Sequence, residues 1–237
     1  MSKLIAISGV KNVGKSCSAG FLKFLLNTPK CLHYYWIYRL FPNLSLTQNW
    51  KEVSFAGTLK EMLAVLLNVP VETFESRDFK ENVYIDFNNL SFHRKEDLNK
   101  NQILSDSKFS RKINDMSIDV KTNMLSVRQL LQYWGTEIMR KFFGDQLWCL
   151  TTLKLAETNK LIISDLRFKV EANMVKERRG TIIYIDRPGC SVGNHQSEKE
   201  AFELYQSGKC DYVIHNNKTL KDLFNECKKI AHEIKST

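Results

Sequence analysis

Short runs of apolar residues alternate with amphipathic stretches along most of this chain. The apolar runs predict buried strands at residues 3–7, 51–56, 160–165, 181–186 and 211–214. Apolar residues at helical spacing predict helices over 17–26, 58–67, 126–142, 146–158, 168–178 and 219–234, with a short helical segment opening at 195–198. Strands that alternate with helices predict an α/β fold, a three-layer sandwich built on a parallel sheet.

Two segments lack this pattern. Residues 27–49 are rich in aromatic side chains and give no clear assignment. The part from 31 to 41 is too short to span a bilayer, which takes about 20 residues. We expect it to pack on the core or at an interface, with an amphipathic or membrane-touching segment as the alternative. Residues 71–124 are charged and weakly periodic, which is typical of a lid or binding loop, with partial disorder as the alternative. The expected organisation is one domain, 1–237, with a lid-like insertion at about 71–124.

The first predicted strand runs directly into a glycine loop. Residues 8–16 read Ser-Gly-Val-Lys-Asn-Val-Gly-Lys-Ser, which fits the phosphate-binding motif G-x-x-x-x-G-K-[ST], and a predicted helix follows at once. Gly9 and Gly14 allow backbone N–H groups to point inward at phosphate oxygens, and the helix N-terminus attracts the same anion. Lys15 can reach the β- and γ-phosphates, and the Ser16 hydroxyl can ligate Mg²⁺. Residues 8–16 are called the phosphate loop below.

Polar groups also follow the third predicted strand. Asp165 ends this strand and Arg167 comes two residues later. In open parallel sheets the ligand crevice lies outside the carboxyl ends of the strands, so both side chains are candidates for the site. A helix N-cap is the alternative role for Asp165, and the two roles are compatible. Glu171 would project from the first turn of the next helix toward the same crevice.

The helix that begins near residue 126 carries an unusual glycine. Ser126 and Gln129 have the spacing of a capping box, which predicts the start of the helix. Inside it, Gly135 precedes Thr136, although a mid-helix glycine costs roughly 1 kcal/mol relative to alanine. The glycine therefore indicates the close approach of a ligand or of another helix.

Composition narrows the classes of partner. With 237 residues, 43% of them hydrophobic, the chain can form one α/β domain. A formal net charge of +9 favours nucleotides or nucleic acid, or merely a basic surface. No nucleic-acid motif is found, so a DNA-binding ATPase ranks last. Six cysteines without a C-x-x-C pair argue against zinc and fit reduced thiols in the cytoplasm, and the N-terminus is expected to be a strand rather than a signal peptide.

Further blocks accompany the phosphate loop in a fixed order. They are Phe55-Ala56-Gly57 with Leu59-Lys60, Val127-Arg128-Gln129-Leu130 with Gln132, Gly135-Thr136, Trp148, residues 164–168 with Glu171, Arg187-Pro188, Ser197-Glu198, and Tyr212-Val213-Ile214 with Leu220. Together they resemble the deoxynucleoside monophosphate kinase family of phages and large DNA viruses, over most of the chain outside 27–49 and 76–124. The resemblance implies a P-loop kinase architecture and Mg²⁺-dependent transfer of the ATP γ-phosphate to a deoxynucleoside 5′-monophosphate. A related small-molecule kinase, such as a phosphomevalonate kinase, is the alternative.

The resemblance also implies roles for particular residues. ATP would be held by the phosphate loop, at Gly9, Lys11, Asn12, Val13, Gly14, Lys15, Ser16 and Cys17. Family loops often read Gly-Lys-Asp-Thr where residues 14–17 here read Gly-Lys-Ser-Cys, so metal ligation by Ser16 is inferred from the general motif. The acceptor nucleotide would meet Lys11, Arg77, Gly135, Thr136, Trp148, Asp165, Arg167, Phe168 and Glu171.

Three of these residues would be catalytic by the same resemblance, namely Lys15, Arg167 and Arg77, with Arg94 or Arg111 as alternatives to Arg77. Trp148 and Phe168 suit stacking on a base, and they equally suit a core. Family members tend to be homodimers, and a viral member would act in the host cytoplasm. Neither a nucleic acid nor a membrane is expected as a partner.

Overall fold

The computed structural model describes residues 4–47, 49–99, 102–115, 124–193 and 196–236. Predicted positions Lys3 and His195, and residues 100–101 and 116–123 of the lid-like segment, lie outside these ranges. The chain divides into two compact units, each described by itself: unit 1 comprises Met1–Phe55 and Cys149–Thr237, and unit 2 comprises Ala56–Trp148. The organisation as one domain with a lid-like insertion stays a prediction.

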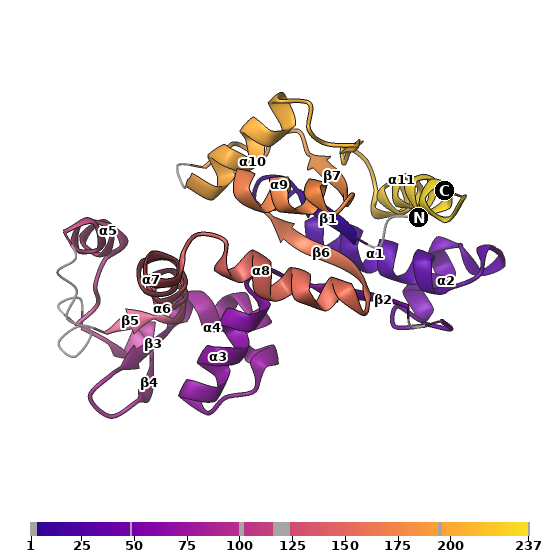
Figure 1. Ribbon diagram of the computed structural model, residues 1–237. Coiled ribbons are helices and arrows are strands. Elements are labelled where there is room, and N and C mark those ends of the chain that lie inside the picture. Colours follow the sequence, from indigo (N-terminus) through magenta and orange to yellow (C-terminus); the bar gives the residue numbers. More distant parts are fainter. Residues whose placement is uncertain (1–3, 48, 100–101, 116–123, 194–195, 237) are drawn as a thin grey trace. The chain divides into compact units, whose positions relative to one another are not determined.

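Unit 1 is built on a parallel sheet. Among the described residues this sheet has five strands in the order β2-β6-β1-β7-β8, and every neighbouring pair is parallel (Figure 1). The central strand β1 is buried at all five positions, as expected where helices cover both faces of a sheet. All of the predicted apolar runs form these strands, which are β1 Leu4–Ser8, β2 Trp50–Val53, β6 Lys160–Leu166, β7 Thr181–Asp186 and β8 Tyr212–His215.

Helices cover the two faces of the sheet. On one face Ile5 and Ile7 of β1 share a buried cluster with residues of α1 and α11. On β7, Tyr184 points to the opposite face from its neighbours and stacks on Tyr205 of α10 with ring centroids 4.6 Å apart. This arrangement confirms the predicted three-layer sandwich. The helices of unit 1 are α1 Lys15–Asn27, α2 Tyr35–Leu40, α9 Lys169–Glu177, α10 Gln196–Gln206 and α11 Leu220–Ser236, with 3₁₀ turns at Lys30–Leu32 and Leu155–Glu157.

The aromatic segment 31–41 packs onto unit 1 through the inner side of α2. The Tyr38 ring meets Phe21 and Phe24 of α1 edge-on, with ring centroids 4.8 and 5.4 Å apart. Just before α2, His33 Nδ1 lies 2.9 Å from His232 Nε2 of α11. The expectation of a core-packing segment is therefore confirmed for this side. No helix within the described ranges is long and apolar enough to cross a membrane.

Unit 2 contains regular structure where weak periodicity predicted a lid or loop. Its described residues include a three-stranded antiparallel sheet in the order β4-β3-β5, formed by β3 Val83–Asp86, β4 Ser91–Arg94 and β5 Leu125–Ser126. Strands of two to four residues are too short to show a period in the sequence. The helices are α3 Gly57–Leu67, α4 Arg77–Asn82, α5 Asp106–Asn114, α6 Val127–Gln132, a π-helix Tyr133–Arg140 and α7 Lys141–Phe143, with 3₁₀ turns at Val71–Glu75 and Lys95–Asp97; α8 Leu147–Lys154 leads back into unit 1.

Candidate functional site

The phosphate loop joins β1 to α1 at the carboxyl edge of the sheet in unit 1. Its backbone has positive φ at Gly9 (140°), Asn12 (67°) and Gly14 (103°), a conformation that turns the chain tightly. At Gly9 a Cβ atom would lie 2.6 Å from the Ile185 carbonyl oxygen, so only glycine fits between the loop and β7. The strand, loop and helix therefore take the order that the motif predicts, and Gly14 is the N-cap of α1.

Lys15 places its ammonium group inside this loop. Nζ donates hydrogen bonds to the carbonyl oxygens of Gly9 and Val10, both at 2.6 Å. The pKa of Lys15 is lowered from 10.5 to about 8, chiefly by burial and next by the positive charge of Arg167, while Glu198 and Asp165 act in the opposite direction. A partly desolvated cation at the N-terminus of α1 is a strong attractor for phosphate oxygens.

Asn216 fastens the loop from the end of β8. Its Nδ2 donates to the Val13 carbonyl oxygen at 2.8 Å, and the side chain is buried. This residue was not among the predicted site residues. The available signal was its position two residues after the last predicted strand, where the carboxyl ends of parallel strands gather.

The carboxylates of Asp165 and Glu171, near the end of β6, accept hydrogen bonds from different backbone segments. The Asp165 carboxylate accepts a hydrogen bond from the Phe55 backbone N–H at 2.7 Å, which ties the chain after β2 to β6. Glu171, only 2% exposed, accepts from the backbone N–H groups of Arg167 at 2.9 Å and Phe168 at 3.1 Å. The cap of α9 is therefore Glu171, and the alternative of an Asp165 cap is wrong because the Asp165 side chain turns toward β2. Contact between Glu171 and an acceptor stays a prediction.

Two arginines lie on the same edge as Lys15. Arg167 follows β6, which pairs with β1 on one side, and its Nη1 lies 3.5 Å from Ser197 Oγ. Arg187 follows β7, which pairs with β1 on the other side, and its Nη1 donates to the Asn12 carbonyl oxygen at 3.5 Å. Arg167 was predicted for the site and Arg187 was assigned no role, although both lie within two residues of the end of a predicted strand. Lys15, Arg167 and Arg187 thus set three positive charges around the phosphate loop.

The remaining predicted residues lie on both units. In unit 1, Lys11, Ser16 and Cys17 are exposed on the loop and the first turn of α1, and Phe168 is partly buried. In unit 2, Arg77 begins α4, and its Nε pairs with both carboxylate oxygens of Glu81 at 3.2 Å. The alternative Arg94 pairs with Asp78, and Arg111 lies in α5. The part that Arg77, Gly135, Thr136 and Trp148 play in a nucleotide site stays a prediction.

Gly135 lies where α3 approaches the π-helix too closely for a larger residue. A Cβ atom there would lie 2.6 Å from Leu59 Cδ2 of α3, which is the close approach that the sequence indicated. Its carbonyl oxygen accepts the indole N–H of Trp148 at 2.9 Å, and Trp148 is 4% exposed. Of the two roles expected for Trp148, the structure thus shows packing, while stacking on a base stays a prediction. The π-helix around Gly135 leaves Thr136 exposed.

We expect Gly135→Ala to destabilise the protein by about 1–3 kcal/mol, because the new methyl group overpacks the contact with buried Leu59. Urea unfolding of the full chain measures the change. The double variant Gly135→Ala, Leu59→Ala should cost less than the sum of the two single variants, since the smaller side chain vacates the contested volume. Strict additivity would show that the two residues do not compete for space.

The described residues contain no group of three or more His, Cys, Asp and Glu side chains that could hold a metal ion. A Mg²⁺ ion suits this site only as a companion of bound phosphates, since Mg²⁺ keeps several waters and takes few protein ligands. Ser16 is exposed in the first turn of α1, and its ligation of Mg²⁺ stays a prediction.

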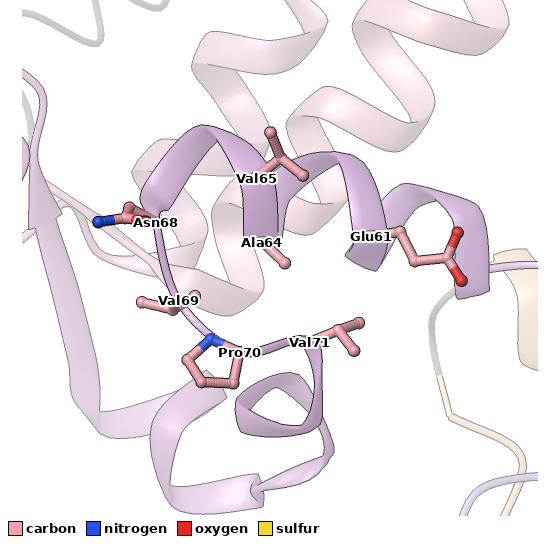
Figure 2. A pocket seen from close by; sticks show the side chains of 7 residues that line it. All are labelled: Glu61, Ala64, Val65, Asn68, Val69, Pro70 and Val71. Carbon is pink, nitrogen blue, oxygen red and sulfur yellow. The ribbon is translucent and has the colours of Figure 1, made fainter.

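A separate surface cavity lies at the end of α3 in unit 2. Figure 2 shows its seven lining residues around the turn from α3 into Pro70, and its volume is about 600 Å³. Those residues are Glu61, Ala64, Val65, Asn68, Val69, Pro70 and Val71, with no cationic side chain among them. The cavity therefore does not suit a phosphate group.

Two comparisons with known proteins name the same family. A family model described as deoxynucleotide monophosphate kinase matches residues 48–227. A protein of Acanthamoeba polyphaga mimivirus, named "Putative deoxynucleotide monophosphate kinase", is 32% identical over 114 residues, in an alignment that covers 42% of this chain and 58% of the viral protein. The phosphate loop precedes residue 48, so its assignment depends on its motif and geometry alone.

A more distant likeness is found among solved structures. Dephospho-CoA kinase from Campylobacter jejuni aligns over 99% of this chain and 98% of its own, at 13% identity and a TM-score of 0.38. A likeness of that order is too remote to inform the site.

Proposed function

Since a family model spans well over half of its length, the chain belongs to the deoxynucleotide monophosphate kinase family, and we propose on that premise that it transfers the γ-phosphoryl group of ATP to a deoxynucleoside 5′-monophosphate. The products are ADP and the deoxynucleoside diphosphate. The observation that carries the proposal is the partly buried ammonium of Lys15 inside a glycine loop, with Arg167 on the adjoining strand end.

The donor nucleotide binds unit 1. The backbone of residues 9–17 surrounds the phosphates of ATP, and Lys15 neutralises the β- and γ-oxygens. Asn216 holds the loop in this shape through the Val13 carbonyl. The Ser16 hydroxyl would hold a Mg²⁺ ion, and that ion would supply further positive charge to the transferring group.

The residues proposed to contact the acceptor are Lys11, Arg77, Gly135, Thr136, Trp148, Asp165, Arg167, Phe168 and Glu171. Arg167 grips the acceptor phosphate with its planar guanidinium, whose two donors match two phosphate oxygens. Glu171 keeps Arg167 in place, because its buried carboxylate accepts the Arg167 backbone N–H. In this proposal Lys15, Arg167 and Arg77 are the catalytic residues.

Transfer itself demands little covalent chemistry from the protein. An oxygen of the acceptor phosphate forms a bond to the γ-phosphorus while the bond to the β–γ bridging oxygen breaks, and the electron pair leaves with ADP. Lys15 and the N–H groups of the loop stabilise the negative charge on the transferring group in the transition state. Enzymes that transfer phosphoryl groups obtain most of their rate acceleration from such electrostatic stabilisation and from positioning. The acceptor phosphate is already ionised near neutral pH, so no general base is required.

We propose further that the enzyme works as a homodimer in the cytoplasm, with nucleotides as its partners and without nucleic acid or a membrane. All six cysteines are free, in keeping with a reducing compartment. Trp36 and Phe41 at α2 are 61% and 57% exposed, and they are available to a second copy. Light scattering coupled to gel filtration measures the mass in solution, and a monomer at micromolar concentration would contradict the dimer.

A coupled assay of ADP release tests the reaction. Mg-ATP is offered with dGMP, dTMP, dCMP, dAMP, their ribose counterparts or phosphomevalonate, and a reaction without acceptor measures background hydrolysis. We expect turnover with at least one deoxynucleotide. Activity with phosphomevalonate alone would support the alternative, a phosphomevalonate kinase. ATP binding without ADP release in the presence of any acceptor would contradict the proposed reaction.

A further inference from the structure

Unit 2 gathers cationic side chains on its helices. Lys60 on α3 pairs with Glu75 at 2.7 Å, and its side chain is only 16% exposed. Arg128 on α6 pairs with Glu81 of α4 at 2.9 Å. Since α4 and α3 both pack against α6, these charged groups belong to one neighbourhood.

Lys80 is the cation in this neighbourhood that lacks a partner. Among the described residues its ammonium makes no ion pair or hydrogen bond, although the side chain is partly buried on α4. The two nearby carboxylates are taken, since Glu75 holds Lys60, and Glu81 holds Arg128. Burial lowers the pKa of Lys80, and the positive charges of Lys60 and then Arg128 lower it further, outweighing Glu75 and Glu81.

An unpaired, partly desolvated cation among like charges is costly for a folded protein. A bound anion removes that cost. With Arg77, which also pairs with Glu81, the group holds four cations against two carboxylates and so has a surplus of two positive charges. A phosphate monoester carries about two negative charges at neutral pH, which matches this surplus.

We propose that Lys80, flanked by Lys60 and Arg128, binds the phosphate group of the acceptor nucleotide. The proposal rests on the proposed function for the identity of that phosphate, while the anion site itself rests on unit 2 alone. Lysine acts here as a compact point charge and Arg128 as a planar fork, a combination suited to a dianion. The apolar cavity at the end of α3 has no such groups and remains outside the site.

Steady-state kinetics test the proposal in the full chain. We expect Lys80→Met to raise KM for the deoxynucleoside monophosphate about 10- to 100-fold, the loss typical of one charge-assisted contact, with KM for ATP changed less than twofold. Lys80→Arg should recover part of the affinity. Lys95→Met is the matched control, an exposed lysine of the same unit at the start of a 3₁₀ turn, and it should leave both KM values unchanged. An unchanged acceptor KM in Lys80→Met would overturn the proposal.

A second readout separates the anion site from the reaction. Inorganic phosphate is the probe, and its effect on the melting temperature is compared between Lys15→Met and the double variant Lys15→Met, Lys80→Met. We expect phosphate to stabilise the first protein and to stabilise the second far less, even if no deoxynucleotide is turned over. Equal stabilisation of the two would overturn the site, and so would a melting temperature lowered by Lys80→Met without phosphate, which would mark a structural role.

Discussion

Replacing Lys15 with methionine is expected to lower turnover at least about a thousandfold and, in the absence of nucleotide, to make the protein more stable. The loss of activity follows from removing the charge that faces the transferring phosphoryl group, an interaction that strengthens in the transition state. The gain in stability follows from the environment of the ammonium, which the folded protein partly buries inside the phosphate loop.

The sign and the size of the stability gain come from the pKa of Lys15. Its folded value is about 8 against 10.5 in a model compound, so folding disfavours the charged form. At about 1.4 kcal/mol per pKa unit the penalty is about 3.5 kcal/mol, and the lost hydrogen bonds to Gly9 and Val10 offset part of it, which leaves a net gain of about 1–2 kcal/mol. The penalty is complete below pH 8, shrinks as pH rises through 8, and is gone above 10.5.

Urea unfolding at pH 7 and again at pH 9.5 measures this difference. We expect Lys15→Met to exceed the wild type clearly at pH 7 and by less at pH 9.5. Lys221→Met, at an exposed lysine of α11, is the matched control and should alter neither stability nor turnover. A Lys15→Met protein that is less stable than the wild type at pH 7 would show that the ammonium holds the loop together rather than straining it.

Arg167→Lys is the second change with a large expected effect. We expect kcat/KM for the acceptor to fall about 100-fold, while the dissociation constant of ATP changes less than about threefold. A lysine keeps the positive charge beside Lys15 but loses the two parallel donors that grip a phosphate, so the variant isolates the geometry of the guanidinium from its charge.

The experiment compares acceptor kinetics with ATP binding measured by titration calorimetry. Arg178→Lys provides the control, since Arg178 lies just past the other end of α9 and is exposed. If Arg167→Lys weakened ATP binding as much as it slowed transfer, Arg167 would serve the donor rather than the acceptor.

Local sequence patterns predicted the shape of the phosphate loop, because its parts are neighbours in the sequence. The strand, the glycine loop and Lys15 follow one another within residues 4–27, and their hydrophobic pattern and motif determine them together. Asn216 and Arg187 were not predicted as site residues because they reach the loop from the ends of β8 and β7. No neighbouring residue in the sequence indicates that a side chain will hydrogen-bond a distant carbonyl. The sequence left two roles for Asp165, in the site or as the N-cap of α9, for the same reason. The backbone N–H that donates to its carboxylate belongs to Phe55, which is far away in the sequence.

Unit 2 shows a different limit of sequence reasoning. Its strands have two to four residues, and the outer strand β4 alternates half-buried with exposed positions, so the sequence of this segment resembles a charged loop. The sequence predicted the helix around Gly135. The structural reason for the glycine is its contact with Leu59, which lies more than seventy residues earlier in the chain. Packing between distant segments is what one sequence shows least.

The order of strands in unit 1 has a consequence for synthesis on the ribosome. Strand β1 is made first but lies between β6 and β7, whose residues begin only at Lys160. While unit 2 emerges, β1 still lacks β6 and β7, the two strands that pair with it in the folded protein, whereas the contiguous unit 2 can already pair its own strands. In the growing chain we therefore expect unit 2 to fold before the sheet of unit 1, and the phosphate loop to take its folded shape only once the last third of the protein has been translated.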